Sequence, residues 1–162
     1  MKDIKHTKEG AVSHITAYPP IAYLFAIVFG LISDNVINFR VGLYEEPWAE
    51  TLGIIFLVLA SLLIVWAQYS SQTTFKTKHV IDVKEEDFHK GPYHFIRHPT
   101  YLGLFCLCLG FGLLAYSFSV IVLSFAAFFV INYYIVPHEE EILLSKYGEE
   151  YKSYRERTKR YI

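Results

Sequence analysis

Residues 99–137 read PTYLGLFCLCLGFGLLAYSFSVIVLSFAAFFVINYYIVP and contain no charged side chain. One helical crossing of a bilayer core of about 30 Å needs roughly 20 apolar residues at about 1.5 Å per residue. This run of 39 residues is therefore long enough for two crossings. We predict a helical hairpin, with a tight turn between Ala115 and Ser119.

The two ends of this run carry polar motifs. Pro99 suits the first position of a helix, because its missing N–H has no partner there in any case. Arg97 and His98 are then expected at the N-terminus of the first hairpin helix. The motif Pro137-His138-Glu139-Glu140 is expected just past the end of the second.

Two further runs without charge, residues 15–33 and 51–75, are each long enough for one crossing. The first is the weaker, because Pro19 and Pro20 lie near its start, and a buried or tilted helix is an alternative there. We predict an all-α, polytopic membrane protein with about four transmembrane helices in a single domain, residues 1–162. A net charge of −1 and 17% aromatic residues are not typical of nucleic-acid-binding proteins, so no nucleic-acid partner is expected.

The basic residues predict the orientation. With four crossings, both termini and the loop at 76–98 share one face, and that face carries all but one of the 15 Lys and Arg residues. Arg40 alone falls on the other face. Because cytosolic loops are enriched in Lys and Arg, we predict that both termini are cytosolic, in the inner or plasma membrane if the source is prokaryotic.

A hairpin brings its two ends to one membrane face, although they are about 40 residues apart in sequence. Arg97, His98 and Tyr101 should therefore meet Glu139 and Glu140. A helix N-terminus beside an arginine favours anions. A carboxylate pair can hold an ammonium group or a ribose diol. Considered singly, these residues also fit a basic membrane anchor and a cap of a surface helix.

The tail beyond Glu140 has apolar and aromatic residues at roughly helical spacing, with Lys and Arg between them. This pattern predicts a C-terminal interfacial amphipathic helix, with a break or kink at Gly148. It fits either a membrane-surface anchor or a lid over the mouth of the hairpin.

Other patterns in the chain do not indicate a site. Cys106 and Cys108 point in different directions on a helix and are expected to pack. The letters of residues 110–115 match a dinucleotide-binding fingerprint, but no strand precedes them, so small residues for helix packing are expected instead. Among the histidines, His94 and His98 alone have helical ligand spacing, and no metal site is predicted.

Two motifs together resemble a known family. The block GPYHFIRHPTYLG, residues 91–103, resembles the G-P-Y-x-x-x-R-H-P-x-Y-x-G signature of isoprenylcysteine carboxyl methyltransferases and related phospholipid methyltransferases. Glu139-Glu140 followed by YGEEY, residues 147–151, and then Tyr154 and Arg157 resembles the family's C-terminal pattern. The resemblance runs from about 88 to 160. The chain departs from the pattern at Tyr147, where the family has Phe, and at Arg160, where the final R-x-x-P element lacks its proline.

The resemblance implies a methyltransferase that uses S-adenosylmethionine and is built without a Rossmann domain. The residues that it implies for the cofactor are Tyr93, His98, Tyr101, Glu139 and Glu140. It implies Arg97 and Arg157 as partners of the substrate or its carboxylate. From its position in the membrane, Asn132 is a further candidate for cofactor contact, with helix–helix bonding an equal alternative.

The chemistry that follows depends on the acceptor. A carboxylate is ionised at neutral pH and needs no base, so the protein has only to desolvate and align donor and acceptor. A lipid amine needs a base, for which Glu140 or a tyrosine is available. We expect a lipid-like or prenylated acceptor, most simply a carboxylate, with a phospholipid amine as the alternative. There are two alternatives of other classes. One is a membrane reductase that uses NADPH, and the other is a non-catalytic membrane scaffold. The sequence leaves the acceptor and the oligomeric state open.

Overall fold

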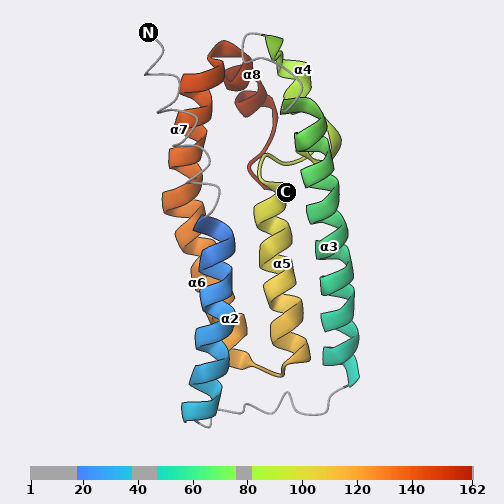
Figure 1. Cartoon of the computed structure of the whole chain (residues 1–162), viewed down its shortest axis with the longest axis vertical. Helices are drawn as coiled ribbons and strands as arrows, with labels where there is room; N and C mark the ends of the chain where they lie inside the picture. The colour runs from blue at the N-terminus through green and yellow to red at the C-terminus, as the bar shows by residue number, and fades with distance from the viewer. Residues whose placement is uncertain (1–17, 38–46, 76–81, 162) are drawn as a thin grey trace.

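The protein is an antiparallel bundle of helices (Figure 1). A computed structural model describes residues 18–37, 47–75 and 82–161. The helices are α2 (Tyr18–Ile37), α3 (Pro47–Phe75), α4 (Glu85–Phe88), η2 (Gly91–His94), α5 (Pro99–Leu114), α6 (Phe118–Val130), η3 (Ile131–Ile135), α7 (Val136–Tyr147) and α8 (Glu149–Arg157). The expectations for residues 1–17, for Arg40 and for residues 76–81 lie outside these ranges.

The helices confirm an all-α membrane protein. Three of them are long and apolar enough to cross a membrane, namely Tyr18–Val36, Pro47–Gln72 and the joined stretch Phe118–Tyr147. The fourth column of the bundle, α5, is apolar but has only 16 residues, a length of about 24 Å. Its N-terminal end therefore lies well inside the span of its longer neighbours (Figure 1).

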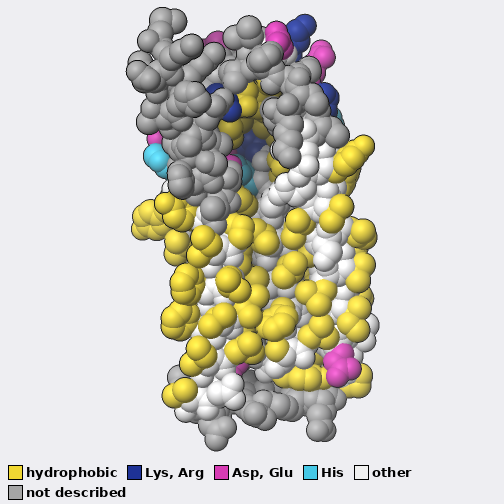
Figure 2. Space-filling model, in the orientation of Figure 1, with side chains coloured by type: hydrophobic (Ala, Val, Ile, Leu, Met, Phe, Trp, Pro, Cys, Tyr) yellow, Lys and Arg dark blue, Asp and Glu magenta, His cyan; other side chains and the backbone are white. Residues whose placement is uncertain are grey.

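The outer surface of the bundle is apolar. Large side chains such as Leu24, Leu59 and Val65 are each at least 60% exposed. Figure 2 shows apolar side chains spread over the middle of the bundle, while charged side chains gather toward its ends. This distribution suits a surface whose solvent is lipid rather than water.

The predicted turn between Ala115 and Ser119 is confirmed. Helix α5 ends at Leu114, and Ser117 caps α6 by accepting a hydrogen bond from the backbone N–H of Val120 at 3.1 Å. Ser117 also donates to Asp34, which ties the turn to α2. The turn thus closes the hairpin at the end of the bundle away from Arg97.

The prediction that the second hairpin helix ends near Pro137 is wrong. The helix passes through Pro137 and continues to Tyr147, so Glu139 and Glu140 lie within it. The reason is the π-helical turn η3, in which the N–H of Val136 bonds the carbonyl of Ile131, five residues earlier. This wider turn shifts the hydrogen-bond register, and Pro137 falls in the first turn of α7. The carbonyl of Asn132, one turn earlier, accepts from Nη1 of Arg160 at 3.4 Å.

The predicted break at Gly148 is confirmed. Gly148 has φ 61°, in the left-handed region that glycine enters freely, and it separates α7 from α8. The aromatic face of α8 does not point outward, because Tyr151 and Tyr154 are buried against Phe88 of α4. Helix α8 thus covers the end of the bundle, as the lid alternative expects.

Glycines bring α3 and α5 into close contact. A Cβ atom built on Gly110 of α5 would lie 2.8 Å from the carbonyl oxygen of Gly53 and 3.0 Å from the backbone nitrogen of Leu57, both on α3. The expectation that residues 110–115 serve helix packing is therefore confirmed for Gly110. Cys106 and Cys108 are free cysteines in the same helix, and Cys108 is buried.

We expect Gly110→Ala to lower the free energy of unfolding by about 1–3 kcal/mol, because the added methyl meets backbone atoms that cannot rotate away. Gly112→Ala is the matched control, because its methyl would meet side-chain atoms of Ile121 and Val120 at 2.8 and 3.3 Å and backbone only at 3.4 Å, so we expect a smaller loss. Denaturant titration in detergent micelles measures both variants. Equal losses for the two would contradict the close backbone approach at Gly110.

Candidate active site

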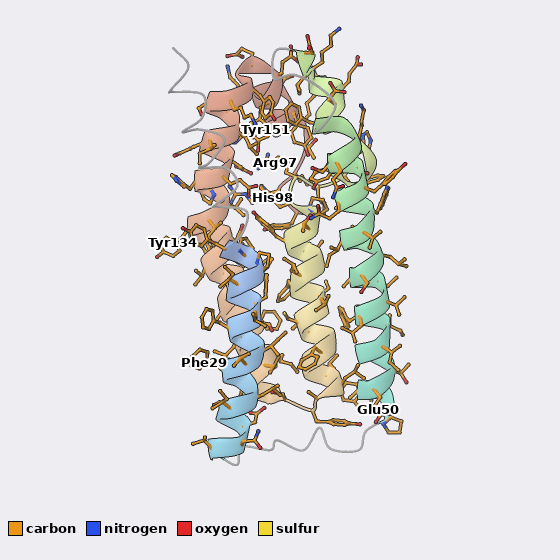
Figure 3. The ribbon with its side chains drawn as sticks, in the orientation of Figure 1. Phe29, Glu50, Arg97, His98, Tyr134 and Tyr151 are labelled. Carbon is orange, nitrogen blue, oxygen red and sulfur yellow. The ribbon has the colours of Figure 1, made fainter. Side chains whose placement is uncertain are left out.

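The candidate site lies where the N-terminus of α5 faces α7. His98 is the N-cap residue of α5, and Pro99 occupies its first turn as expected. Glu139 and Glu140 come from α7. Figure 3 shows Arg97, His98 and Tyr151 together at this end of the bundle, with Glu50 at the opposite end. The hairpin therefore does bring the two motifs together.

Glu140 is the centre of an ionic cluster. Its side chain is 1% exposed, and one carboxylate oxygen lies 3.0 Å from both Nε and Nη2 of Arg97 and 3.2 Å from Nε2 of His98. The other oxygen lies 3.2 Å from Arg160 and 3.5 Å from Arg155. A buried carboxylate in contact with three guanidinium groups is held ionised, and it neutralises part of their charge.

Arg97 joins the hairpin to the C-terminal segment. Its Nη1 donates to the carbonyls of Arg155 and Thr158, the latter at 2.8 Å. Its backbone N–H donates to the carbonyl of Lys159 at 3.0 Å, beside the isolated bridge of Ile96 and Lys159. The guanidinium of Arg97 is thus already engaged by the protein.

Glu139 has a different environment from its neighbour. Its Oε2 accepts a hydrogen bond from the hydroxyl of Tyr101 at 2.7 Å and lies 3.6 Å from Nδ1 of His98. The Tyr101 ring stacks on the imidazole of His98, with centroids 5.4 Å apart. Unlike Glu140, Glu139 lines a cavity.

This cavity has a volume of about 520 Å³. It lies among the ends of α2, α3 and α5, helices α4 and α7, and α8. In Figure 2, basic and histidine side chains are seen inside a recess at this end of the molecule. A volume of this size is typical of pockets that bind small molecules. The lining residues that bear on chemistry are Gln68, Ser71, Phe88, Tyr93, Arg97, His98, Tyr101, Glu139, Lys146, Tyr147, Tyr151 and Tyr154.

Aromatic side chains form one wall of the cavity. Phe88 contacts Tyr147, Tyr151 and Tyr154, with ring centroids 5.2, 5.5 and 5.3 Å away. The hydroxyl of Tyr154 donates to the carbonyl of Tyr93 at 2.8 Å. Burial raises the pKa of the Tyr93, Tyr151 and Tyr154 phenols above their ordinary value. These hydroxyls therefore stay protonated at neutral pH and act as donors, not as bases.

The structure places the candidate residues from the sequence in three groups. Tyr93, His98, Tyr101, Glu139 and Arg97 line the cavity. Glu140 lies behind the cavity wall and contacts the basic residues instead.

Asn132 and Arg157 are not brought to the cavity. Asn132 contacts Arg160, while Arg157 is 71% exposed and pairs with Glu85 on α4. The exposed position of Arg157 follows from α8, which turns its tyrosines inward and its charges outward. All of the assigned roles stay predictions.

Three basic residues of the site were not identified from the sequence, nor was the aromatic wall around Phe88. Arg155 and Arg160 contact Glu140, and Lys146 lines the cavity. The signal for Lys146 is its spacing, because Glu139, Leu143 and Lys146 recur at i, i+4 and i+7 on one helical face. The helix predicted for the tail begins beyond Glu140, so the sequence alone does not place Glu139 and Lys146 on one helix.

The comparisons with known proteins identify the family. The model of the family described as phospholipid methyltransferase matches residues 48–150, nearly two thirds of the chain, from α3 into α8. Protein-S-isoprenylcysteine O-methyltransferase A of Arabidopsis thaliana is 26% identical over 146 residues, covering 83% of this chain and 70% of the plant protein. No solved structure matches. The match spans both hairpin helices and the cavity-lining end of α7, and the chain therefore belongs to the phospholipid methyltransferase family of membrane methyltransferases.

Proposed function

We propose that the protein transfers a methyl group from S-adenosylmethionine to the carboxylate of a lipid-like or prenylated acceptor. The observation that carries this proposal is the cavity at the hairpin mouth, which has a carboxylate on one side and tyrosines on the other. It lies between the apolar outer surface of the bundle and its charged end, where a soluble donor and a lipid-borne acceptor can meet. The Arabidopsis relative, by its name, methylates an isoprenylcysteine.

The residues of the cavity fit S-adenosylmethionine. Its volume of about 520 Å³ lies within the range of pockets that bind small molecules. Glu139 can accept hydrogen bonds from a ribose diol or an ammonium group. The aromatic wall around Phe88 can stack on a base or attract a cation to its ring faces. When bound, this group supplies an electrophilic methyl on a sulfonium.

The protein's own contribution is alignment and exclusion of water. Helix α8 and the buried Phe88, Tyr151 and Tyr154 form a wall that covers one side of the cavity. Two reacting groups that are held in line in a site with little water react much faster than the same groups meeting freely in solution. The tyrosines lining the cavity are poor bases. This favours an acceptor that is already ionised, such as a carboxylate, over an amine that must lose a proton.

A phospholipid amine is the second candidate, because the matching family model is described as phospholipid methyltransferase. Glu139 would then be the base, since it is the cavity's carboxylate. The same donor site serves both candidates.

The charge distribution supports a cytosolic site. Within residues 18–37, 47–75 and 82–161, every Lys and Arg lies at or beyond the α5 N-terminus, on the side of the cavity. Because the cytosolic faces of membrane proteins carry an excess of Lys and Arg, we infer that the cavity and the C-terminus face the cytosol. The donor then enters from the cytosol.

Calorimetric titration of the purified protein tests the donor. We expect saturable 1:1 binding of S-adenosylmethionine and of S-adenosylhomocysteine, and none of NADPH. A labelled-methyl assay then compares N-acetyl-S-farnesylcysteine, a fatty acid and phosphatidylethanolamine. Turnover of the first two supports the carboxylate, and turnover of the third alone supports the amine. If neither donor ligand binds, the proposed function is wrong.

A further inference from the structure

Helix α7 presents two opposite charges to the cavity. Glu139, Leu143 and Lys146 all line it, as their spacing on one helical face requires. Glu139 and Lys146 are seven residues apart, which corresponds to about 10 Å along the helix axis. The cavity therefore has an acidic end beside Tyr101 and a basic end beside Tyr147.

The basic end has no acidic partner in the described part of the chain. The contact found for Lys146 is with its neighbour, with Nζ 5.2 Å from the centre of the Tyr147 ring. Residues three and four positions earlier on α7 are Leu143 and Ile142, which carry no charge. Three positions later, Glu149 lies beyond Gly148 and pairs with Lys152 at 3.1 Å.

The other basic side chain of the cavity is already committed. Arg97 directs Nε and Nη2 to Glu140, and Nη1 to two backbone carbonyls. To receive a ligand carboxylate, its guanidinium would have to release a partner that is almost completely buried. Removing a partner from a buried ion pair is costly. The sequence-based role of Arg97 as a carboxylate partner is therefore less favourable than the same role for Lys146.

We propose that Lys146 is the residue of this cavity that binds a ligand carboxylate. The proposal rests on the proposed function and extends it. Two carboxylates fit the chemistry, that of the methionine part of the donor and that of the acceptor. Either would form a charge-assisted hydrogen bond with the ammonium of Lys146.

Three variants test the proposal. Lys146→Gln keeps most of the side chain and removes the charge, whereas Lys146→Arg keeps the charge. Lys152→Gln is the matched control, because Lys152 is an exposed lysine of the next helix that pairs with Glu149 and does not line the cavity. The measurements are calorimetric affinities for S-adenosylhomocysteine and for 5′-methylthioadenosine, which lacks the carboxylate, and KM for N-acetyl-S-farnesylcysteine.

The pattern of losses identifies the carboxylate. If Lys146 binds the donor, Lys146→Gln lowers the affinity for S-adenosylhomocysteine about tenfold and leaves the affinity for 5′-methylthioadenosine unchanged. If it binds the acceptor, both nucleoside affinities are unchanged and KM rises about tenfold. In both cases Lys146→Arg retains most of the wild-type value, and Lys152→Gln retains all of it.

Two results would overturn the proposal while leaving the proposed function intact. One is a Lys146→Gln variant whose affinities and KM equal those of the wild type. The other is an equal loss of affinity for S-adenosylhomocysteine and for 5′-methylthioadenosine, which would mean that Lys146 affects the shape of the cavity. Failure of the wild type itself to bind S-adenosylhomocysteine would contradict the proposed function, and this inference with it.

Discussion

Glu140→Gln is expected to lower the free energy of unfolding by about 3 kcal/mol, the largest stability effect that we predict for a single conservative change. The glutamine has nearly the same shape, but it removes the one negative charge that Arg97, Arg155 and Arg160 share. Arg97 is only 10% exposed, so water replaces little of what it loses. The other two arginines are more exposed, which limits their part in the loss.

The loss should be concentrated in the C-terminal segment. Residues 155–160 are held by Glu140 and Arg97, through two guanidinium groups and three backbone carbonyls. Hydrogen exchange followed by mass spectrometry should therefore show faster exchange in residues 155–161 than elsewhere. Denaturant titration in micelles gives the overall free energy.

Glu141→Gln is the control, because Glu141 is the next residue on the same helix and is exposed. Its substitution should change stability by no more than about 0.5 kcal/mol. Equal stabilities of the Glu140 and Glu141 variants would show that the ionic cluster contributes nothing net.

Glu139→Gln is expected to weaken the binding of S-adenosylmethionine by about 10–100-fold, with little change in stability. Glu139 lines the cavity and accepts one hydrogen bond from Tyr101, and its remaining acceptor capacity is available to a ligand. Loss of a hydrogen bond to a charged group costs about 1.5–3 kcal/mol, which corresponds to this range. Calorimetric titration of the variant measures the loss directly.

Arg157→Gln provides the comparison for binding. The resemblance to the family assigns Arg157 a role with the substrate, but its side chain is 71% exposed and pairs with Glu85 outside the cavity. We expect its affinity for S-adenosylmethionine to equal that of the wild type. The site as described would be contradicted if Glu139→Gln bound S-adenosylmethionine as tightly as the wild type does, or if Arg157→Gln bound it more weakly.

Much of the fold could be predicted from runs without charge. The length of residues 99–137 indicated two helices and a turn, and Ser117 supplied the cap that ends the turn. Pro99 indicated the start of α5. These predictions succeeded because burial of the backbone in lipid leaves few structures available to such runs.

The course of the chain through Pro137 could not be predicted in the same way. A proline inside a helix usually ends it, and the π-helical turn that accommodates it has no strong sequence signal. The error had a consequence for the site. With Glu139 and Glu140 outside a helix, nothing distinguishes them, whereas within α7 they point about 100° apart and have separate environments.

The individual partners of the site residues could not be predicted either. Arg157 and Arg160 are both basic residues of the tail, yet one pairs with Glu85 and the other with Glu140. That difference is decided by the end of α8 at Arg157, after which the chain turns back toward Ile96. Such a turn depends on tertiary contacts and not on local composition.

The π-helical turn at Ile131–Ile135 also makes the number of residues in the helix matter as much as their identity. It inserts one residue between a lipid-facing half, α6, and a cavity-facing half, α7. A residue deleted in α7 between Val136 and Glu139, where no wider turn absorbs the change, would turn both glutamates by about 100° and direct them away from their partners. Substitutions in α6 leave that angular relation intact. Substitutions on the lipid surface should therefore affect the cavity little, whereas an insertion or deletion between Val136 and Glu139 should disrupt it.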